Sequence, residues 1–379
     1  MPLVLTEEQE MLKESARGFL DEKAPVAMLR TLRDERSEAG YSVKLWKEMA
    51  EMGWAGILVD EAHGGSGFGF VGAGVLAEEM GRTLTASPFL STAILGATAL
   101  NKFGSDAQRG EFLPKIAAGA MVMALGVDEG RKHGPAATEM TAEKSGNGFR
   151  LSGAKTFVAD GHIADKIIVA ARTAGAPGDE AGLSLFLVDA KAKGVSAERT
   201  AMVDSRNAAR LVFENVAVTG EDLIGEIDNG HAALDGILSA GRAGLAAELS
   251  GAAQQAFAMT TDYLKQRTQF GKSIGSFQAL QHRAAQLYCE VELMKSVVLK
   301  SLQDLDNAFG MASVTASLAK AKAGDVAKLA SQEAIQMFGG VGMTDEYDIG
   351  LYMKRIRVAQ ELFGDSHYHA DRIARLRGY

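Results

Sequence analysis

The sequence predicts an α+β multidomain protein with a helical N-terminal domain, a central antiparallel β-barrel or sandwich and a C-terminal helical bundle. Three observations lead to this prediction. The chain has 379 residues, more than one small domain usually holds. Helix-type periodicity fills both ends, and short strand-type segments fill only the middle. With only 6 prolines, long uninterrupted helices are favoured.

The first predicted domain covers residues 1–117 and is helical from residue 6 onward. In "LTEEQEMLKESARGFL", Thr6 precedes a first turn rich in acidic residues, which is a typical helix start. The stretches "YSVKLWKEMAEMGWAGIL" and "FVGAGVLAEEMGRTL" predict further helices, separated by the glycine-rich turn "EAHGGSGFG".

The second predicted domain, residues 118–225, has a different texture. "MVMALGV", "FRLSGAKTFVADG", "DKIIVAAR", "LSLFLVDA" and "ARLVFENVAV" are short, rich in Val, Ile and Phe, and separated by Gly, Asn or Asp. No helical pattern lies between them, so an antiparallel barrel or sandwich is favoured over a parallel βαβ sheet.

The third predicted domain, residues 226–379, is helical again. Apolar residues at 277, 280, 284, 287, 288, 291, 294 and 298 form one stripe. The alanine-rich segment "ASVTASLAKAKAGDVAKLASQEAIQMFGG" permits close helix packing and stops at a glycine pair, which is a usual helix end. These features predict a bundle.

Composition excludes several function classes. The formal charge is −8 with both signs scattered, which argues against a nucleic-acid-binding surface. The one cysteine, Cys289, offers neither an internal disulfide nor metal-ligand spacing, so no metal is expected. The N-terminal residues lack a signal-peptide pattern, and no run reaches the roughly 18 apolar residues that a membrane span needs. The sequence therefore predicts a soluble cytoplasmic protein with no membrane partner.

Six blocks in order resemble the acyl-CoA dehydrogenase family over essentially the whole chain: "LTEEQ", "LAEEMGR", "GAKTFV…AD", "RTQFGKSIGSFQ", "QMFGGVGMTDEY" and "LYMKRIR". The resemblance implies a central β-barrel, a C-terminal four-helix bundle and a tetramer. It also implies FAD, an acyl-CoA substrate desaturated between its α and β carbons in fatty acid β-oxidation, and electron-transferring flavoprotein as the electron acceptor.

The resemblance also assigns a cofactor-binding edge that reaches FAD held mainly by a neighbouring subunit. An Arg can fork onto a pyrophosphate, a ring can pack beside flavin or adenine, and glycines allow close backbone approach. In isolation the same residues fit a surface Arg with a core Phe, and a helix end with a turn. The edge comprises Arg267, Phe270, Gln278, Gln336, Gly339 and Gly340.

The within-subunit half of the flavin site is altered. Where the family carries Thr-Glu-Pro-x-Ala-Gly-Ser-Asp, this chain reads "VDEGRKHG", Val127 to Gly134, without hydroxyls for the flavin edge. Where the family carries Trp-Ile-Thr, Phe157 keeps a ring and Ala159 lacks the hydroxyl. Asp160 is either a substitute for that hydroxyl or an ordinary strand-end turn residue.

Both family positions for the catalytic Glu hold glycine. The Tyr-Glu-Gly-Thr motif aligns with Phe363, Gly364, Asp365 and Ser366, and Ser366 remains a candidate for cofactor contact. The other family position is Gly241, just before Arg242, a supporting candidate. Asp365 is the catalytic candidate, although a one-residue shift turns a helical side chain by about 100°.

Other titratable groups near Asp365 are less specific. His367 and His369 fit a histidine pair at a helix start as well as a titrating pair. Glu361 and Glu248 are nearby carboxylates with no motif behind them.

Three hypotheses follow from the missing glutamates. In the first, the chain is one subunit of a hetero-oligomer with a base-bearing paralogue, since it keeps the cross-subunit residues and loses the within-subunit ones. Its tail, "GGVGMTDEY…LYMKR…LFGD", also resembles small subunits of pimeloyl-CoA and steroid side-chain dehydrogenases. In the second, it is a self-sufficient homotetrameric enzyme that uses a base such as Asp365. In the third, it is a relic without FAD.

Overall fold

The computed structural model describes residues 3–379 and divides them into two compact units. One unit contains the chain up to Thr31 with Gly74–Thr85 and Arg242–Tyr379. The other contains Leu32–Ala73 and Ala86–Gly241. The three-domain division of the sequence analysis stays a prediction.

Before the sheet, the chain is helical, as predicted. A capping box at Thr6 starts α1: its hydroxyl accepts from the Gln9 amide while the Gln9 side chain accepts from the Thr6 amide. Gly53, at φ +80°, follows the end of α3. The helices are α1 (Glu7–Lys23), α2 (Val26–Asp34), α3 (Val43–Glu51), α4 (Gly69–Thr83), the π-helix η2 (Phe89–Gly96), α5 (Ala97–Phe103) and α6 (Asp106–Ala117).

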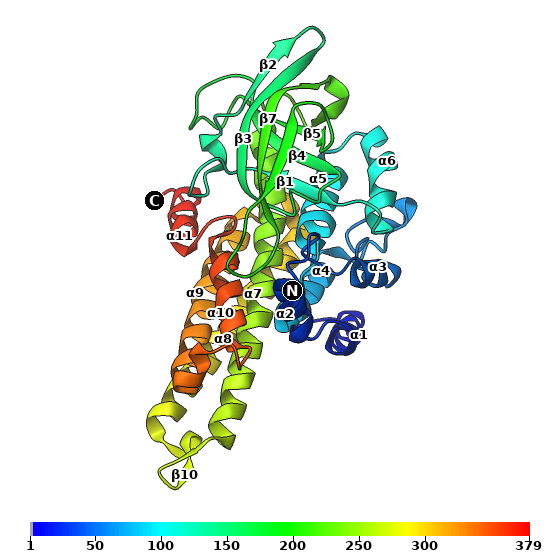
Figure 1. Cartoon of the computed structure of the whole chain (residues 1–379). Helices are drawn as coiled ribbons and strands as arrows, with labels where there is room; N and C mark the ends of the chain where they lie inside the picture. Colours follow the sequence, from blue (N-terminus) through cyan, green and yellow to red (C-terminus); the bar gives the residue numbers. More distant parts are fainter. Residues whose placement is uncertain (1–2) are drawn as a thin grey trace. The chain divides into compact units, whose positions relative to one another are not determined.

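The central strands form one eight-stranded sheet in the order β6-β7-β3-β2-β4-β5-β8, with β1 pairing off this path with β4 (Figure 1). Its apolar core includes Leu151, Phe186, Leu211 and Phe213. The strands are β1 (Met123–Gly126), β2 (Thr141–Ser145), β3 (Gly148–Ala159), β4 (Lys166–Arg172), β5 (Leu183–Asp189), β6 (Val195–Arg199), β7 (Ala208–Val218) and β8 (Leu223–Ile224).

Two details of the predicted sheet are wrong. The order runs from β6 to β8 without closing, so the sheet is not a barrel. It is also not purely antiparallel, because β1 and β2 both pair with β4 in parallel. Short strands without helices between them predict antiparallel hairpins of consecutive strands. The pattern does not predict pairing between strands that are not consecutive in the chain.

The C-terminal part of the chain consists of long helices, and α7, α8, α9 and α10 lie together in Figure 1. The predicted stripe on α8 is confirmed at Leu287, Val291, Met294 and Val298, which are buried. Tyr288, also predicted on the stripe, is 53 % exposed. The elements are α7 (Gly230–Gln266), β9 (Thr268–Gln269), β10 (Lys272–Ser273), α8 (Gln278–Ala308), α9 (Ser313–Phe338), η7 (Gly339–Met343), α10 (Ile349–Glu361) and α11 (Ser366–Leu376).

Helix α9 presents a face of alanines to its neighbours. Ala316, Ala319, Ala323, Ala327 and Ala330 are all fully buried at intervals of three or four residues. Such spacing places the five methyl groups on one face of the helix, where backbones can approach closely. The alanine-rich segment therefore packs as the sequence predicts.

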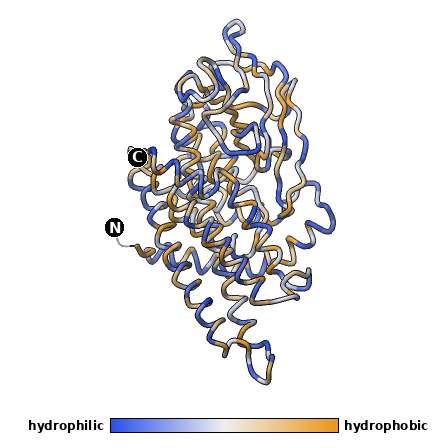
Figure 2. Tube along the Cα trace, turned by 90° about the vertical axis from the view of Figure 1, so that its left-hand side faces the viewer, coloured by the Kyte–Doolittle hydropathy of each residue, from blue (hydrophilic) through white to orange (hydrophobic). Residues whose placement is uncertain are grey.

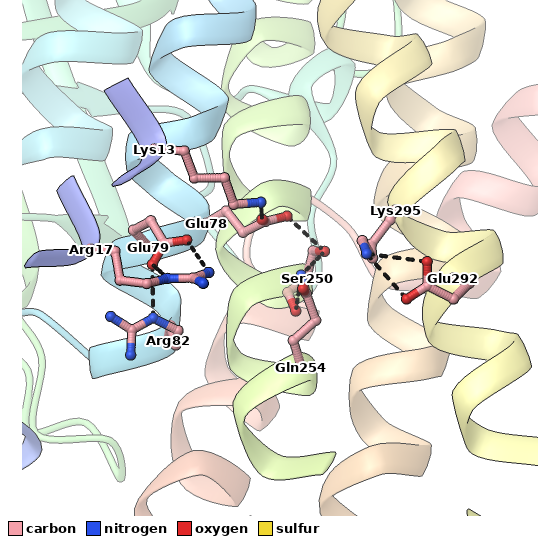
Figure 3. A network of polar contacts seen from close by, with 9 residues as sticks. All are labelled: Lys13, Arg17, Glu78, Glu79, Arg82, Ser250, Gln254, Glu292 and Lys295. Carbon is pink, nitrogen blue, oxygen red and sulfur yellow. Dashed lines mark hydrogen bonds and ion pairs between the residues drawn. The ribbon is translucent and has the colours of Figure 1, made fainter. Parts of the chain in front are cut away.

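Ion pairs fix α1 against α4 in the same unit (Figure 3). The Glu79 carboxylate is 1 % exposed and accepts hydrogen bonds from the guanidinium groups of Arg17 and Arg82. One helical position earlier, Glu78 pairs with Lys13 at 2.6 Å and accepts from the Ser250 hydroxyl of α7 at 3.2 Å. A buried carboxylate of this kind depends on its cations, since an unpaired charge away from water is costly.

Candidate functional site

The hairpin between α7 and α8 carries the first part of the predicted cofactor-binding edge. Strands β9 and β10 pair Gln269 with Lys272, leaving Phe270 and Gly271 as the two turn residues, with φ +54° and +78°. Positive φ at both central positions is the geometry of a tight hairpin turn, and it is rare for a phenylalanine. The Phe270 side chain is 90 % exposed. Its ring contacts that of Phe277, edge to face at 6.2 Å.

Arg267 lies at the base of this hairpin and is exposed. Its amide donates to the Tyr263 carbonyl and its carbonyl accepts from the Ile274 amide, so the backbone is fixed. Within residues 3–379, no carboxylate pairs with its guanidinium. Gln278 is the first residue of α8 and is also exposed.

The end of α9 carries the second part of the edge. Gln336 is exposed in the last turn of α9, and Gly339 and Gly340 follow it. A Cβ atom added to either glycine would meet nothing within 4 Å, and Gly339 has φ +70°. A backbone open to solvent in this way permits the close approach of a ligand.

An aromatic stack brings the two parts to the same end of the unit. The Tyr263 ring of α7 lies 4.3 Å from the Phe338 ring of α9, nearly parallel to it. Tyr347 packs edge-on against both rings. The stack therefore holds the start of the hairpin segment close to the residue just before Gly339.

The turn between α10 and α11 carries the catalytic candidate. Phe363 and Gly364 have φ +60° and +103°. Asp365 is the N-cap of α11, and its carboxylate accepts from the Tyr368 amide at 2.8 Å. Ser366 is the first residue of the helix and is partly exposed. The structure thus gives the Asp365 side chain a capping role.

The two glycines have different surroundings, and Gly364 offers no simple room for a glutamate. Gly241 is buried inside α7. A Cβ atom on Gly364 would lie 2.4 Å from Tyr368 Cδ1 and 3.0 Å from its Cγ. The left-handed backbone there would strain any other residue as well.

The other carboxylates near the turn have partners. Glu248 and Arg355 form a buried, two-pronged ion pair with distances of 2.7 and 2.9 Å. Glu361 pairs with Arg357 at 2.7 Å on the surface. Arg242, the supporting candidate, is fully buried in α7. A carboxylate that holds a buried arginine is not available as a general base, because proton uptake would break that pair.

A buried lysine, which the sequence analysis missed, lies beside this turn. Lys320 of α9 is 1 % exposed and donates to the carbonyls of Gln360 at 2.8 Å and Gly364 at 2.9 Å. Burial, and then the charge of Arg242, lower the pKa of Lys320 to about 7. In the sequence, Lys320 directly follows Ala319 and lies three residues before Ala323, on the buried face of α9. This position could have indicated that the lysine is buried.

In the β-sheet unit, the segment after β1 is held by a carboxylate–histidine contact and by an ion pair. Asp128 contacts the His133 ring nitrogen Nδ1 at 2.9 Å and accepts from the Gly134 amide. Glu129 pairs with the fully buried ammonium of Lys155 at 2.7 Å. Burial lowers the pKa of Lys155, and Glu129 partly opposes this shift. The segment therefore presents internally engaged carboxylates where the family has hydroxyls.

Phe157 lies at an irregularity of β3. The register of β3 against β7 shifts between Lys155 and Val158, and Phe157 has φ +52°. Bulges of this kind redirect side chains. The residue is 47 % exposed, so part of it is accessible to a ligand.

Clusters of metal-ligand side chains and helices of membrane-spanning length are both absent from the part of the chain that the structure describes. Across residues 3–379, no three His, Cys, Asp or Glu side chains gather as metal ligands. No helix among these residues is long and apolar enough to cross a membrane. Hydrophobic and hydrophilic residues are interleaved along the trace (Figure 2).

Three family models match the chain in order. The N-terminal domain of acyl-CoA dehydrogenases matches residues 6–120, the middle domain residues 127–216, and the C-terminal domain residues 228–376.

Whole-chain comparisons agree. The short-chain specific acyl-CoA dehydrogenase of Megasphaera elsdenii is 31 % identical over 373 residues, covering 95 % of each chain. A chain in the solved structure named "Electron transferring flavoprotein of Acidaminococcus fermentans" superposes with a TM-score of 0.90 at 30 % identity, covering 100 % of both. A chain of the Tcur3481-Tcur3483 steroid ACAD gives a TM-score of 0.87 at 32 % identity, covering 98 % of both.

Proposed function

Because the chain belongs to the acyl-CoA dehydrogenase family, we propose that it serves the α,β-desaturation of an acyl-CoA thioester as one subunit of a hetero-oligomer whose partner carries the base. Members of this family are FAD-dependent oxidoreductases that act on CH–CH bonds. FAD, when bound, supplies the acceptor for the hydride that leaves the β-carbon. The proton acceptor for the α-carbon must be a protein group within hydrogen-bond reach.

The edge formed by the hairpin and the end of α9 fits a dinucleotide held by a neighbour. Arg267 offers a guanidinium with no carboxylate partner in the described chain, Phe270 offers an exposed ring, and Gly339 and Gly340 offer open backbone. An arginine fork suits a pyrophosphate, and a ring suits a flavin or adenine face. We infer that Gln278 and Gln336 complete this edge.

The half of the flavin site that this chain would supply for a cofactor of its own fits FAD less well. The carboxylates of Asp128 and Glu129 are engaged by His133 and Lys155, and residues 127–134 carry no hydroxyl. Phe157 and Ser366 remain the candidates for cofactor contact within the chain. This asymmetry supports a chain that completes a neighbour's site better than its own.

The missing base is the observation that carries the proposal. Both family positions hold glycine, Glu248 is held by Arg355, and Asp365 caps a helix. The similarity to a chain of Tcur3481-Tcur3483 supports an assembly of two different chains. The Acidaminococcus fermentans structure supports electron-transferring flavoprotein as the electron acceptor.

The test compares the chain alone with the chain co-expressed with the product of a neighbouring gene. We expect the lone chain to be colourless and inactive with a panel of acyl-CoAs and an artificial electron acceptor. The co-expressed complex should be yellow and active. A complex that never retains flavin would instead support a relic.

Asp365 provides the decisive variant, because its two possible roles can be separated. Asp365→Ser keeps an N-cap and removes the carboxylate, whereas Asp365→Ala removes both. If the lone chain turns over and Asp365→Ser abolishes turnover while the fold is retained, the self-sufficient enzyme is correct. If Asp365→Ser behaves like the parent and only Asp365→Ala is destabilised, the aspartate is a cap.

A further inference from the structure

Lys320 connects two backbone carbonyls that flank the turn between α10 and α11. One acceptor is Gln360, in the last turn of α10, at 2.8 Å. The other is Gly364, the residue just before the cap of α11, at 2.9 Å. The lysine thus reaches from α9 to both ends of a five-residue segment, 360–364.

That segment needs external support. Phe363 and Gly364 both have positive φ, and Phe363 is 5 % exposed. A buried non-glycine residue in this conformation is strained and persists only where its surroundings fix it. The carbonyls at a helix C-terminus also lack intrahelical donors, so a side-chain N–H donor from another helix satisfies them.

We propose that Lys320 is the positioning residue of the α10–α11 turn, and that its two hydrogen bonds hold Asp365 and Ser366 in place for the site. The second half of this statement rests on the proposed function, because it assumes that Ser366 contacts the cofactor. The first half does not, since the order of the turn can be measured without turnover.

The charged surroundings of Lys320 come from three helices of the same unit. Arg242 of α7 disfavours the ammonium, whereas Glu361 of α10 and Asp365 before α11 favour it. Arg372 of α11 donates to the hydroxyl of Ser317 of α9, one turn before Lys320. It buries His369 as well. Glu290 of α8 pairs with Lys322, not with Lys320.

Burial outweighs the two carboxylates, and the pKa of Lys320 falls to about 7. Opening the turn would expose the amine to water, where its pKa returns towards the ordinary value of 10.5. The open state therefore binds the proton more tightly than the closed one. By linkage, the closed turn gains stability as pH rises from about 7 towards 10.5.

Amide hydrogen exchange over residues 360–368 tests this inference on the intact chain, with rates corrected for the intrinsic pH dependence of exchange. We expect protection to increase between pH 7 and 9 by up to about tenfold per pH unit. Lys320→Met should abolish the slope and lower the protection at pH 9, because it removes both hydrogen bonds and the titrating group. Lys320→Arg keeps a donor that stays protonated, so it should restore protection without the slope.

Each outcome is informative. A slope of equal size in Lys320→Met would overturn the inference, as would a turn that exchanges equally in all three proteins. Should Lys320→Met not fold, the parent chain and Lys320→Arg still decide: protection of residues 360–368 that rises with pH in the parent but not in Lys320→Arg supports the inference, and equal slopes overturn it. If Lys320→Met loses the protection of the turn but the co-expressed complex keeps its flavin, the positioning role of Lys320 is upheld and the role of Ser366 at the cofactor is refuted.

Discussion

Placing a glutamate at Gly364, one of the two positions where the sequence resemblance expects the catalytic carboxylate, is expected to fail as a single substitution. The backbone there has φ +103°, a conformation that side chains other than glycine rarely adopt. A new Cβ atom would also lie 2.4 Å from Tyr368 Cδ1, about 1 Å short of an ordinary contact. Rotation of the ring about its own axis can move Cδ1 away, but Tyr368 Cγ stays 3.0 Å from the new Cβ atom, closer than an ordinary contact.

The two effects can be estimated separately. Backbone strain at such a residue costs about 1–3 kcal/mol. Forcing extra volume into a packed site costs about 1–3 kcal/mol more. Gly364→Ala should therefore lower the free energy of unfolding by about 2–6 kcal/mol. In a Tyr368→Ala background only the strain remains, so the same change should cost about 1–3 kcal/mol.

Chemical denaturation of the four proteins in this double-mutant cycle measures both values. The overlap with Tyr368 predicts a coupling energy of about 1–3 kcal/mol. Equal costs in the two backgrounds would refute the overlap, and a cost below about 0.5 kcal/mol in the parent would refute the strain as well. If the reasoning holds, Gly364→Glu should give no turnover alone, and Gly364→Glu with Tyr368→Ala is the variant to assay with acyl-CoAs.

Three further predictions concern charges and the exposed ring. Glu248→Leu should destabilise the chain by about 3–5 kcal/mol, because it removes the carboxylate that holds buried Arg355, whereas adding Arg355→Met should recover much of the loss; equal denaturation midpoints for the single and double variants would contradict this. Glu129→Gln should destabilise the chain most at low pH and progressively less as pH rises towards the ordinary lysine pKa of 10.5, because Lys155 needs its counter-charge only while protonated. Denaturation across pH 6–10 checks this, and a loss independent of pH would contradict it. Phe270→Ala should leave the melting temperature of the lone chain unchanged but reduce flavin retention by the co-expressed complex, with the 79 % exposed Met311→Ala as control; equal flavin content in both variants would refute the role of the ring.

The helices were predictable because their signals are local. The cap at Thr6 appears where the sequence places it, and so does the apolar stripe on α8 from Leu287 to Val298, apart from the exposed Tyr288. The open sheet was not predictable in the same way, since the parallel pairing of β1 with β4 joins segments about 40 residues apart along the chain.

The candidate site was predictable only as a set of positions. Sequence motifs identify Asp365 as a carboxylate near a catalytic register, but only coordinates show that it accepts from the Tyr368 amide. The same is true of Glu248, whose partner Arg355 lies more than one hundred residues further along the chain. A buried pair of this kind leaves no local pattern in the sequence.

The alanine face of α9 has a consequence for the two hydrogen bonds that Lys320 donates to the α10–α11 turn. Lys320 can extend to α10 because its neighbours on that face, Ala316 and Ala323, end at a methyl group. One turn further on, a Cβ atom at Gly324 would already touch Gln360 Cγ at 3.4 Å. The small residues around Lys320 therefore set the distance between α9 and α10. A single branched side chain in their place would move Lys320 out of reach of its two carbonyl acceptors, although every residue of the turn itself would be unchanged.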